Sequence, residues 1–339
     1  MSKSYHPLIR RPYPRVISLV VPIYNEAAVI PLLLARLDGL LNQIACETEI
    51  ILVNDGSSDR SMDLLLERAE KDHRYKVVGL ARNFGHQIAA TAGLDCARGD
   101  AVALMDADLQ DPPEIVLKMI AKYEEGFDVV YARRIKRDGE SVFKRFTAWI
   151  FYRMMRAMVH KDLPLDTGDF RLVSRRCLDA LKSMKELHRF LRGMVAWVGF
   201  PQTNVDFVRP PRAAGTTKYP LRKMLPLAWN AALSFSALPL RLSFYFGILL
   251  IGIAAAYAGY GLWRIFSGEY VVPGWLSQLV VSCLTSGAIM LSLGILGEYV
   301  GRIFEEIKQR PLYTILMTAN MENAGKERET YEDELTGPV

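Results

Sequence analysis

The chain has 339 residues, of which 50% are hydrophobic and 23% are charged, and its formal net charge is +5. This length is typical of about two domains. The mild positive charge does not by itself indicate nucleic-acid binding, and we expect no nucleic-acid partner, but the charge suits an anionic membrane surface or anionic substrates. No sustained apolar segment precedes Pro22, so we predict no cleavable signal peptide.

Between residues 16 and 132, five apolar segments alternate with helix-like segments. The apolar segments are rich in β-branched residues and read ISLVVPIY, EIILVND, KVVGLA, AVALMD and FDVVYA. This alternation predicts an α/β fold, with a mostly parallel sheet covered by helices on both faces. Ligands bind at the carboxyl ends of the strands in such sheets, so the polar residues that follow the strands are the candidate site.

The first two strands end in polar segments. VPIYNE closes the first, and its Pro22 ends ladder pairing, while Tyr24 is suited to stacking on a base and Glu26 to accepting hydrogen bonds from one. NDGSSD closes the second, and its Asp55 is expected to point into the cleft. Taken singly, both segments are more typical of turns with helix caps, in which Ser58 or Asp59 would cap the next helix.

The fourth strand runs into AVALMDADLQDPPE, where three acids follow an apolar segment. Asp106 and Asp108 are two residues apart, so in an extended segment they share one face and repel each other unless a cation or a proton lies between them. Oxygen ligands suit Mg²⁺ or Mn²⁺, and Gln110 adds a neutral oxygen with the same spacing. We expect Asp111-Pro-Pro-Glu114 only to begin the next helix.

Two long uncharged segments lie near the C-terminus. Leu242 to Trp263 is long enough, at about 33 Å, to cross a bilayer core of about 30 Å, and Tyr270 to Gly297 supplies a second spanning helix. The alternative is a buried helical hairpin in a soluble core. The connection is short, and Lys and Arg flank the outer ends, so the positive-inside rule predicts that both outer ends are cytoplasmic.

Two further segments, residues 141–159 and 218–235, mix aromatic and aliphatic residues with Lys and Arg. They are typical either of core helices with a solvated basic face or of amphipathic helices lying on a membrane surface.

The motifs VPIYNE, NDGSSD and DADLQDPPE are followed by DTGDFRLVSRR (Asp166 to Arg176), HRFLRGMVAWVG (His188 to Gly199) and GTTKYPLRKM (Gly215 to Met224), and then by the two apolar segments. From about Val16 to Tyr313 this order resembles the family 2 glycosyltransferases with a GT-A fold. It is most similar to their polyprenyl-phosphate branch, which includes bacterial bactoprenol glucosyltransferases and dolichol-phosphate-mannose synthases.

The resemblance implies a role for each matching position. Pro22, Tyr24, Glu26, Asp55 and Asp106 would bind the donor nucleotide. Asp106, Asp108 and Gln110 would hold Mg²⁺ or Mn²⁺ with the diphosphate. Asp166, Asp169 and Arg171, with Asp108, would be catalytic. Arg192, Arg212 and Lys218 would contact the acceptor phosphate or form the covering loop.

The activity implied is that of a metal-dependent hexosyltransferase. It would transfer one sugar with inversion, by first expectation glucose from UDP-glucose, to undecaprenyl or another polyprenyl phosphate for cell-envelope glycosylation. GDP-mannose and UDP-N-acetylglucosamine stay open as donors. A competing class is a membrane-anchored nucleotide-binding sensor or a glycolipid flippase subunit. The acceptor phosphate is already a nucleophile at neutral pH, because its second pKa lies near ~6, so no strong general base is needed.

Two departures from the family pattern concern the loop and the C-terminal half. Relatives carry an aromatic residue where Ala213 precedes Ala214-Gly215, and the chain has no QxxRW motif, which argues against processive polysaccharide synthases.

The domains expected from these patterns end with the membrane hairpin and a tail. The resemblance also implies a bacterial cytoplasmic membrane protein with cytoplasmic termini, forming a homo-oligomer such as a tetramer. The expected boundaries are an N-terminal extension at 1–15, a catalytic GT-A domain at 16–217, an amphipathic interface helix at 218–240, two transmembrane helices at 241–300 and a cytoplasmic tail at 301–339.

Overall fold

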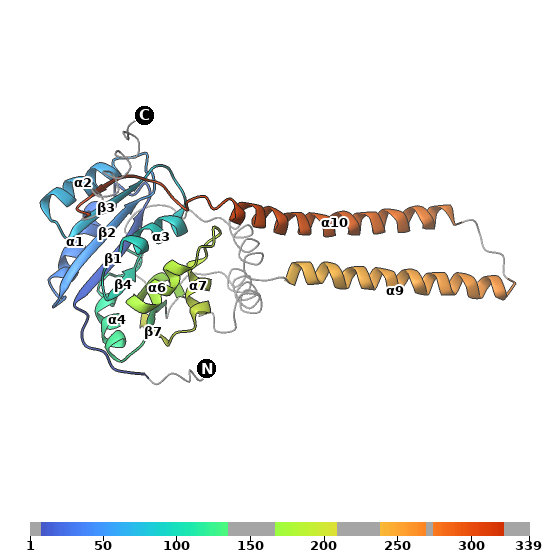
Figure 1. Ribbon diagram of the computed structural model, residues 1–339, viewed down its shortest axis with the longest axis horizontal. Helices are drawn as coiled ribbons and strands as arrows, with labels where there is room; N and C mark the ends of the chain where they lie inside the picture. Colours follow the sequence, from blue (N-terminus) through green and yellow to red (C-terminus); the bar gives the residue numbers. More distant parts are fainter. Residues whose placement is uncertain (1–7, 135–166, 209–237, 269–273, 322–339) are drawn as a thin grey trace, which may run out of the picture. The chain divides into compact units, whose positions relative to one another are not determined.

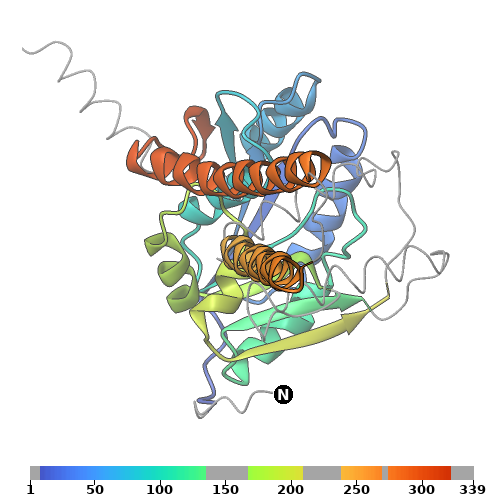
Figure 2. The ribbon, with the colours of Figure 1, turned by 90° about the vertical axis from the view of Figure 1, so that its right-hand side faces the viewer.

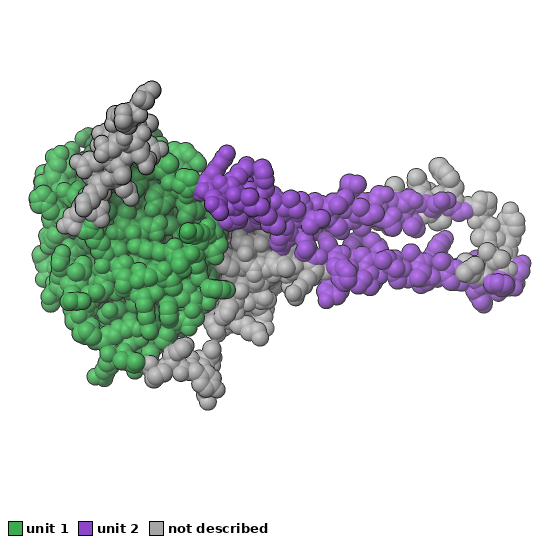
Figure 3. Space-filling view, viewed as in Figure 1, with its two compact units in different colours: residues 1–153, 160–220, 311–339 green, residues 154–159, 221–310 purple. Residues whose placement is uncertain are grey.

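The computed structural model describes residues 8–134, 167–208, 238–268 and 274–321. The chain forms two compact units (Figure 3). The first unit comprises residues 1–153, 160–220 and 311–339, and the second comprises residues 154–159 and 221–310.

The first unit is built on an eight-stranded sheet with the order β7-β5-β6-β4-β1-β2-β3-β8 (Figure 1). Strands β1, β2, β3 and β4 all run parallel to one another, and β5 is parallel to β7. Strands β6 and β8 run antiparallel to the strands beside them. The predicted α/β fold with a mostly parallel sheet is confirmed. The strands are β1 (Val16–Ile23), β2 (Glu47–Asn54), β3 (Tyr75–Leu80), β4 (Ala101–Leu104), β5 (Val129–Arg134), β6 (Thr167–Ser174), β7 (Gln202–Phe207) and β8 (Ile315–Ala319). The helices of this unit are α1 (Ile30–Leu41), α2 (Ser61–Lys71), α3 (His86–Cys96), α4 (Ile115–Glu124), α6 (Arg175–Ser183) and α7 (Leu191–Val198).

Helices cover both faces of the sheet (Figure 2). Alternate residues of β1, such as Leu19 and Val21, join α1 and α4 in one buried apolar cluster. Val20 points the other way, towards α3, where a Cβ atom on Gly93 would lie 2.3 Å from Val20 Cγ1 and 2.9 Å from Val53 Cγ2. Only glycine allows α3 to approach β1 and β2 so closely, and this approach fixes where α3 begins at the sheet edge.

Both ends of the first unit differ from the expected domain limits. Residues 8–15 are not a loose extension, because Arg11 donates to Asp128 and to the Gly126 carbonyl at the amino end of β5. At the other end, β8 lies within the segment expected to be a tail and pairs with β3 instead. A five-residue strand after a long helix gives no periodic signal of its own, and its partner is more than 200 residues away.

The second unit contains the two long apolar helices α9 (Leu238–Phe266) and α10 (Trp275–Ile307), which pack against each other. Each includes a stretch long and apolar enough to cross a membrane, Ser243–Tyr260 and Leu284–Ile307. No residue of either stretch is buried, which argues against the alternative of a hairpin inside a soluble core. The predicted amphipathic segments 141–159 and 218–235 lie outside the described residues.

Candidate active site

The loops that follow β1 and β2 are joined by reciprocal hydrogen bonds. The Asn25 N–H donates to Ser57 Oγ at 3.0 Å, and the Ser58 N–H donates to Asn25 Oδ1 at 2.8 Å. The Glu26 N–H donates to Ser61 Oγ at 3.0 Å. Asn25 has φ +52°, a conformation that asparagine tolerates better than most residues. The two motifs separated in sequence therefore form one rigid surface, on which Tyr24 is 43% exposed.

Asp59 links these loops to the helix that follows. Its Oδ1 accepts from the Ser61 N–H at 3.0 Å, at the first residue of α2, and its Oδ2 accepts from the Ala27 N–H at 3.1 Å. Asp59 thus accepts from the first N–H of α2, although the N-cap position is Arg60 and not Ser58 or Asp59 as predicted, and it also ties the first loop to the second.

Asp55 supports a third loop, between β3 and α3. Its two carboxylate oxygens accept from the Phe84 N–H at 2.7 Å and the Gly85 N–H at 3.0 Å, and the residue is only 2% exposed. Burial raises the pKa of Asp55, although the two N–H groups oppose this shift. The loop passes so close that a Cβ on Gly56 (φ +63°) would lie 2.4 Å from the Arg82 carbonyl carbon. Asp55 therefore holds the neighbouring loop, and does not point into an open cleft as the sequence predicts.

The acidic motif after β4 is a turn. β4 ends at Leu104, Leu109 takes φ +57°, and Asp108 Oδ1 accepts from the Gln110 N–H at 3.1 Å. The extended geometry expected for residues 106–110 is therefore wrong, because the chain must reverse within a few residues to reach α4. The expectation for Asp111-Pro-Pro-Glu114 agrees with the structure, since the helix begins at Ile115 with Glu114 at its N-cap.

The buried oxygens in this turn that accept no hydrogen bond in the described part of the chain include Asp106 Oδ1 and Gln110 Oε1. His86 Nε2 lies 3.4 Å from Asp106 Oδ1, without hydrogen-bond geometry. Burial raises the pKa of Asp106, as do Asp169 and Asp108, while His86 opposes the shift. Carboxylate and amide oxygens are ligands that Mg²⁺ and Mn²⁺ accept. Among the described residues, no group of three His, Cys, Asp or Glu side chains could hold a metal ion.

Asp169 is the centre of a charged cluster. β6 pairs with β4 from Ser174 to Arg171 and continues beyond it, which brings Asp169 to the carboxyl end of the parallel strands. Asp169 Oδ1 accepts from Arg171 Nη2 at 2.9 Å and from Arg192 Nε at 2.8 Å. Burial would raise the pKa of Asp169, but Arg192, His86 and Arg171 hold it well below the usual range. Asp169 is therefore an ionised anchor for cations and a poor proton acceptor.

The two arginines differ in access. Arg171 is 2% exposed and also donates to the Asp169 carbonyl, so it supports Asp169 from beneath. The Arg192 side chain is 32% exposed, at the start of α7. Of these two predicted site residues, Arg192 is the one that a ligand can reach.

The amino end of α3 contributes two residues that no sequence motif indicates. His86 Nε2 lies 3.6 Å from Asp169 Oδ2, and Gln87 Nε2 donates to the same oxygen at 3.2 Å. The Gln87 Oε1 atom accepts from the Leu191 N–H at 3.1 Å. Burial opposes protonation of His86, but Asp169 and Asp106 raise its pKa to about 9, so His86 is a cation at neutral pH. In the sequence, the one signal that could have indicated these two residues is the glycine just before them, Gly85, shortly after the third strand. In the structure it takes φ +96°.

Other basic residues near the motifs are structural or lie elsewhere. Arg175 donates to the carbonyls of Ala97 and Gly99, and Arg176 pairs with Asp128 although its side chain is 56% exposed. The predicted residues Asp166, Arg212 and Lys218, and the departure at Ala213, lie outside the described residues.

Residues 18–182 match the family described as glycosyl transferase family 2. The chain is 48% identical over 306 residues to the uncharacterized glycosyltransferase YkcC of Bacillus subtilis (strain 168), covering 90% of this chain and 95% of that protein. It is 37% identical over 302 residues to the bactoprenol glucosyl transferase of Shigella phage SfII, covering 88% and 97%.

Among solved structures, glucosyl-3-phosphoglycerate synthase from Mycobacterium tuberculosis, in complex with Mn²⁺, UDP and phosphoglyceric acid, matches with a TM-score of 0.48 at 19% identity, over 65% of this chain and 76% of that one. With relatives of this identity along nearly their whole length, the chain belongs to glycosyltransferase family 2.

Proposed function

We propose that this glycosyltransferase transfers one sugar, glucose from UDP-glucose, to a polyprenyl phosphate with inversion. The observation that carries the proposal is the cluster at the carboxyl end of the sheet. There Arg171, Arg192 and His86 surround Asp169, beside Asp106, whose Oδ1 atom is buried although its side chain is 32% exposed. Such a cluster suits a reaction in which a diphosphate and a second phosphate must approach each other. The glucosyl donor and the lipid acceptor are supported by the names of the bactoprenol glucosyl transferases that the chain resembles.

The donor nucleotide would bind against the joined loops after β1 and β2. Tyr24 is exposed there and would stack on the base, next to Pro22 and Glu26. Asp55 would act through the loop of residues 82–85, which its hydrogen bonds hold in one conformation. The diphosphate would lie near Asp106 and Asp108.

A divalent cation would be held by Asp106, Asp108 and Gln110. The Asp106 and Gln110 oxygens that accept no hydrogen bond within the described residues fit such an ion. When bound, the ion neutralises diphosphate charge and stabilises the leaving group. His86 supplies part of the same compensation from the protein, as a fixed positive charge beside Asp106.

The acceptor phosphate requires positioning more than deprotonation. A phosphate monoester is largely dianionic at neutral pH, because its second pKa is about 6. Asp169 cannot serve as an efficient base, since its cationic neighbours lower its pKa. Its role in the proposal is to orient Arg192 towards the acceptor, with Asp166, Arg212 and Lys218 as the further predicted contacts. Preorganised cations of this kind lower a barrier without reorganising during the reaction.

The helices α9 and α10 would place the enzyme at its lipid substrate in the bacterial cytoplasmic membrane. The chain leaves the first unit before α9 and returns to it in β8. A hairpin whose two outer ends both connect to one domain has both ends on the same side of the membrane. The cytoplasmic side proposed for the catalytic domain and the C-terminal segment rests on the Lys and Arg residues that flank these ends. Amphipathic segments 141–159 and 218–235 and homo-oligomer formation belong to the same proposal.

The test is transfer of labelled glucose from UDP-glucose into extractable lipid by the detergent-solubilised full chain with undecaprenyl phosphate. Asp108→Asn and EDTA should each abolish transfer. Asp179→Asn is the matched control, because Asp179 is an exposed aspartate on α6. Full activity after both treatments would contradict the metal role. GDP-mannose and UDP-N-acetylglucosamine complete the donor panel, and nucleotide binding without release of UDP or GDP from any donor would favour the sensor.

A further inference from the structure

The strand that follows the apolar helices is part of the catalytic sheet. β8 pairs with β3 in antiparallel register, from Val77 opposite Ala319 to Leu80 opposite Ile315. The contact is close, because a Cβ on Gly79 would lie 3.1 Å from Met317 Cγ. Antiparallel pairing places the start of β8 at the carboxyl end of β3, where the candidate site lies, and the end of β8 at the opposite edge.

The residues just before β8 contact the start of the loop that Asp55 holds and the far end of the helix that follows this loop. The Thr314 carbonyl accepts from the Ala81 N–H at 2.9 Å, at the first residue of that loop. The Tyr313 hydroxyl donates to Asp95 Oδ2 at 3.0 Å, near the end of α3. The amino end of α3 carries His86 and Gln87. The start of the loop and the helix that follows it are thus both fixed from the C-terminal segment.

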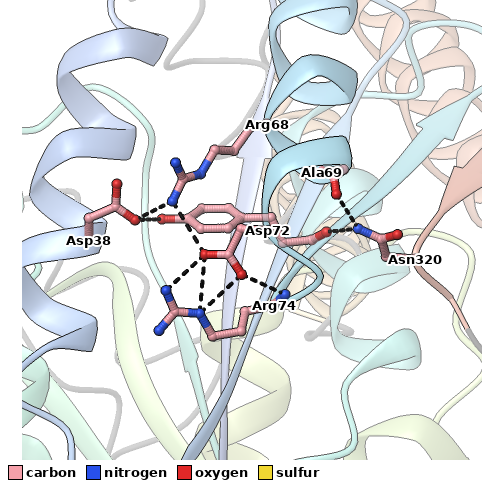
Figure 4. A network of polar contacts seen from close by, with 7 residues as sticks. Asp38, Arg68, Ala69, Asp72, Arg74 and Asn320 are labelled. Carbon is pink, nitrogen blue, oxygen red and sulfur yellow. Dashed lines mark hydrogen bonds and ion pairs between the residues drawn. The ribbon is translucent and has the colours of Figure 1, made fainter.

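At the opposite edge, the end of β8 is fixed by a different residue. Asn320 Nδ2 donates to the Ala69 carbonyl at 2.7 Å and to the Tyr75 carbonyl at 2.9 Å (Figure 4). These contacts stabilise the same strand but lie at the amino end of β3, beside the network of Arg68 and Asp72. The two ends of β8 therefore offer a comparison between site support and general stability.

We propose that Tyr313 is a positioning residue of the donor site, acting through Asp95 and α3 on the loop from Arg82 to Gly85. The identity of the ligand, a nucleoside diphosphate sugar, rests on the proposed function. The contacts of Tyr313 with α3 do not depend on that function. When the Tyr313 contact is lost, α3 and the loop sample more positions, and the donor must bind at the cost of ordering them. This cost raises the Michaelis constant for the donor more than it lowers kcat.

The experiment compares Tyr313→Phe with Asn320→Ala in the detergent-solubilised full chain. We expect Tyr313→Phe to raise the KM for UDP-glucose by about five-fold, the value of one hydrogen bond, with kcat nearly unchanged. Asn320→Ala should lower Tm by at least as much and leave the KM unchanged. Equal KM values for Tyr313→Phe and the wild type, or an equal rise in both variants, would overturn the inference.

Hydrogen exchange separates this inference from the proposed function. The amides of Phe84 and Gly85, which donate to Asp55, should exchange several-fold faster in Tyr313→Phe than in Asn320→Ala, with no donor present. Unchanged exchange at these amides overturns the positioning role even if transfer is observed. Faster exchange in a protein that transfers no sugar from UDP-glucose supports the positioning role and overturns the donor assignment alone.

Discussion

At each end of the parallel strands, which we call the amino edge and the carboxyl edge of the sheet, one aspartate is buried among arginines. At the amino edge, Asp128 binds Arg11 and Arg176 and accepts from Ser174 Oγ at 2.6 Å. At the carboxyl edge, Asp169 binds Arg171 and Arg192 and accepts from Gln87. Both carboxyl groups have a lowered pKa despite burial, because the arginines favour the charged form.

The difference lies in what surrounds each cluster. Asp128 is completely buried, and its partners come from the N-terminal segment and the β6–α6 junction, which it ties together. Asp169 lies near a second carboxylate, Asp106, and near the imidazolium of His86. Arg192 stays partly exposed. The same chemical group is thus enclosed among structural partners at one edge, and at the other it belongs to a partly exposed charged cluster, which is the proposed site.

The largest effect should come from Asp169→Asn. The substitution keeps the size of the side chain but removes the charge that orients Arg192 and His86, and we expect transfer to fall by about 100-fold or more. Labelled-glucose transfer, measured below the Tm of the variant, reports the change. Activity near that of the wild type would mean that the two edges do not differ in function.

Asp128→Asn should reverse this pattern. Removing one charge of a buried ion pair leaves Arg11 without its charged partner, so the free energy of unfolding should fall by about 3 kcal/mol. Because Asp128 lies at the edge away from the site, the folded fraction should retain the specific activity of the wild type. Chemical denaturation and transfer assays on the same preparation give both values. A large loss of specific activity at full folding would contradict a purely structural role.

Much of the carboxyl edge, which is the open edge of the comparison, can be predicted from the sequence, because the motifs found there directly follow strands. The apolar segments alone place the strand ends after β1, β2 and β4 at one edge, and Asp106 and the joined loops are found there. The direction of single side chains is not predictable in the same way. Asp55 turns towards the Phe84 loop, and Arg171 is buried, because these depend on packing between elements far apart in the chain.

Residues without a local pattern cannot be found from the sequence in this way. His86 and Gln87 begin a helix whose approach to the sheet depends on Gly93, a contact that no periodicity reveals. β8 follows 33 residues of apolar helix and pairs with a strand far away in the chain. Asp128 has the sequence context of an ordinary residue before a strand, although it anchors both Arg11 and Arg176.

The pH dependence of stability should distinguish the contribution of the Asp128 charge from that of the other titratable groups. The folded-state pKa of Asp128 lies below its unfolded value of about 3.9. Its stabilisation is therefore complete above about pH 5 and is lost as the pH falls through 3.9 towards the folded-state pKa. The difference in unfolding free energy between wild type and Asp128→Asn should shrink in that window, because other groups titrate equally in both. A constant difference from pH 7 to pH 3 would show that the charge of Asp128 contributes nothing.

The smallest expected effects come from the neutral partners of the two carboxylates. Gln87→Leu removes the donor to Asp169 and the acceptor for the Leu191 N–H, so Arg192 loses part of its alignment. We expect kcat to fall by about ten-fold with little change in Tm. Ser174 Oγ donates to Asp128 and, as the N-cap of α6, accepts from the Cys177 N–H. Ser174→Ala removes both contacts, so it should lower the unfolding free energy by about 2 kcal/mol and leave kcat unchanged. If both variants lost only stability, Gln87 would be a structural residue, and the open edge would be confined to Asp106, His86 and Arg192.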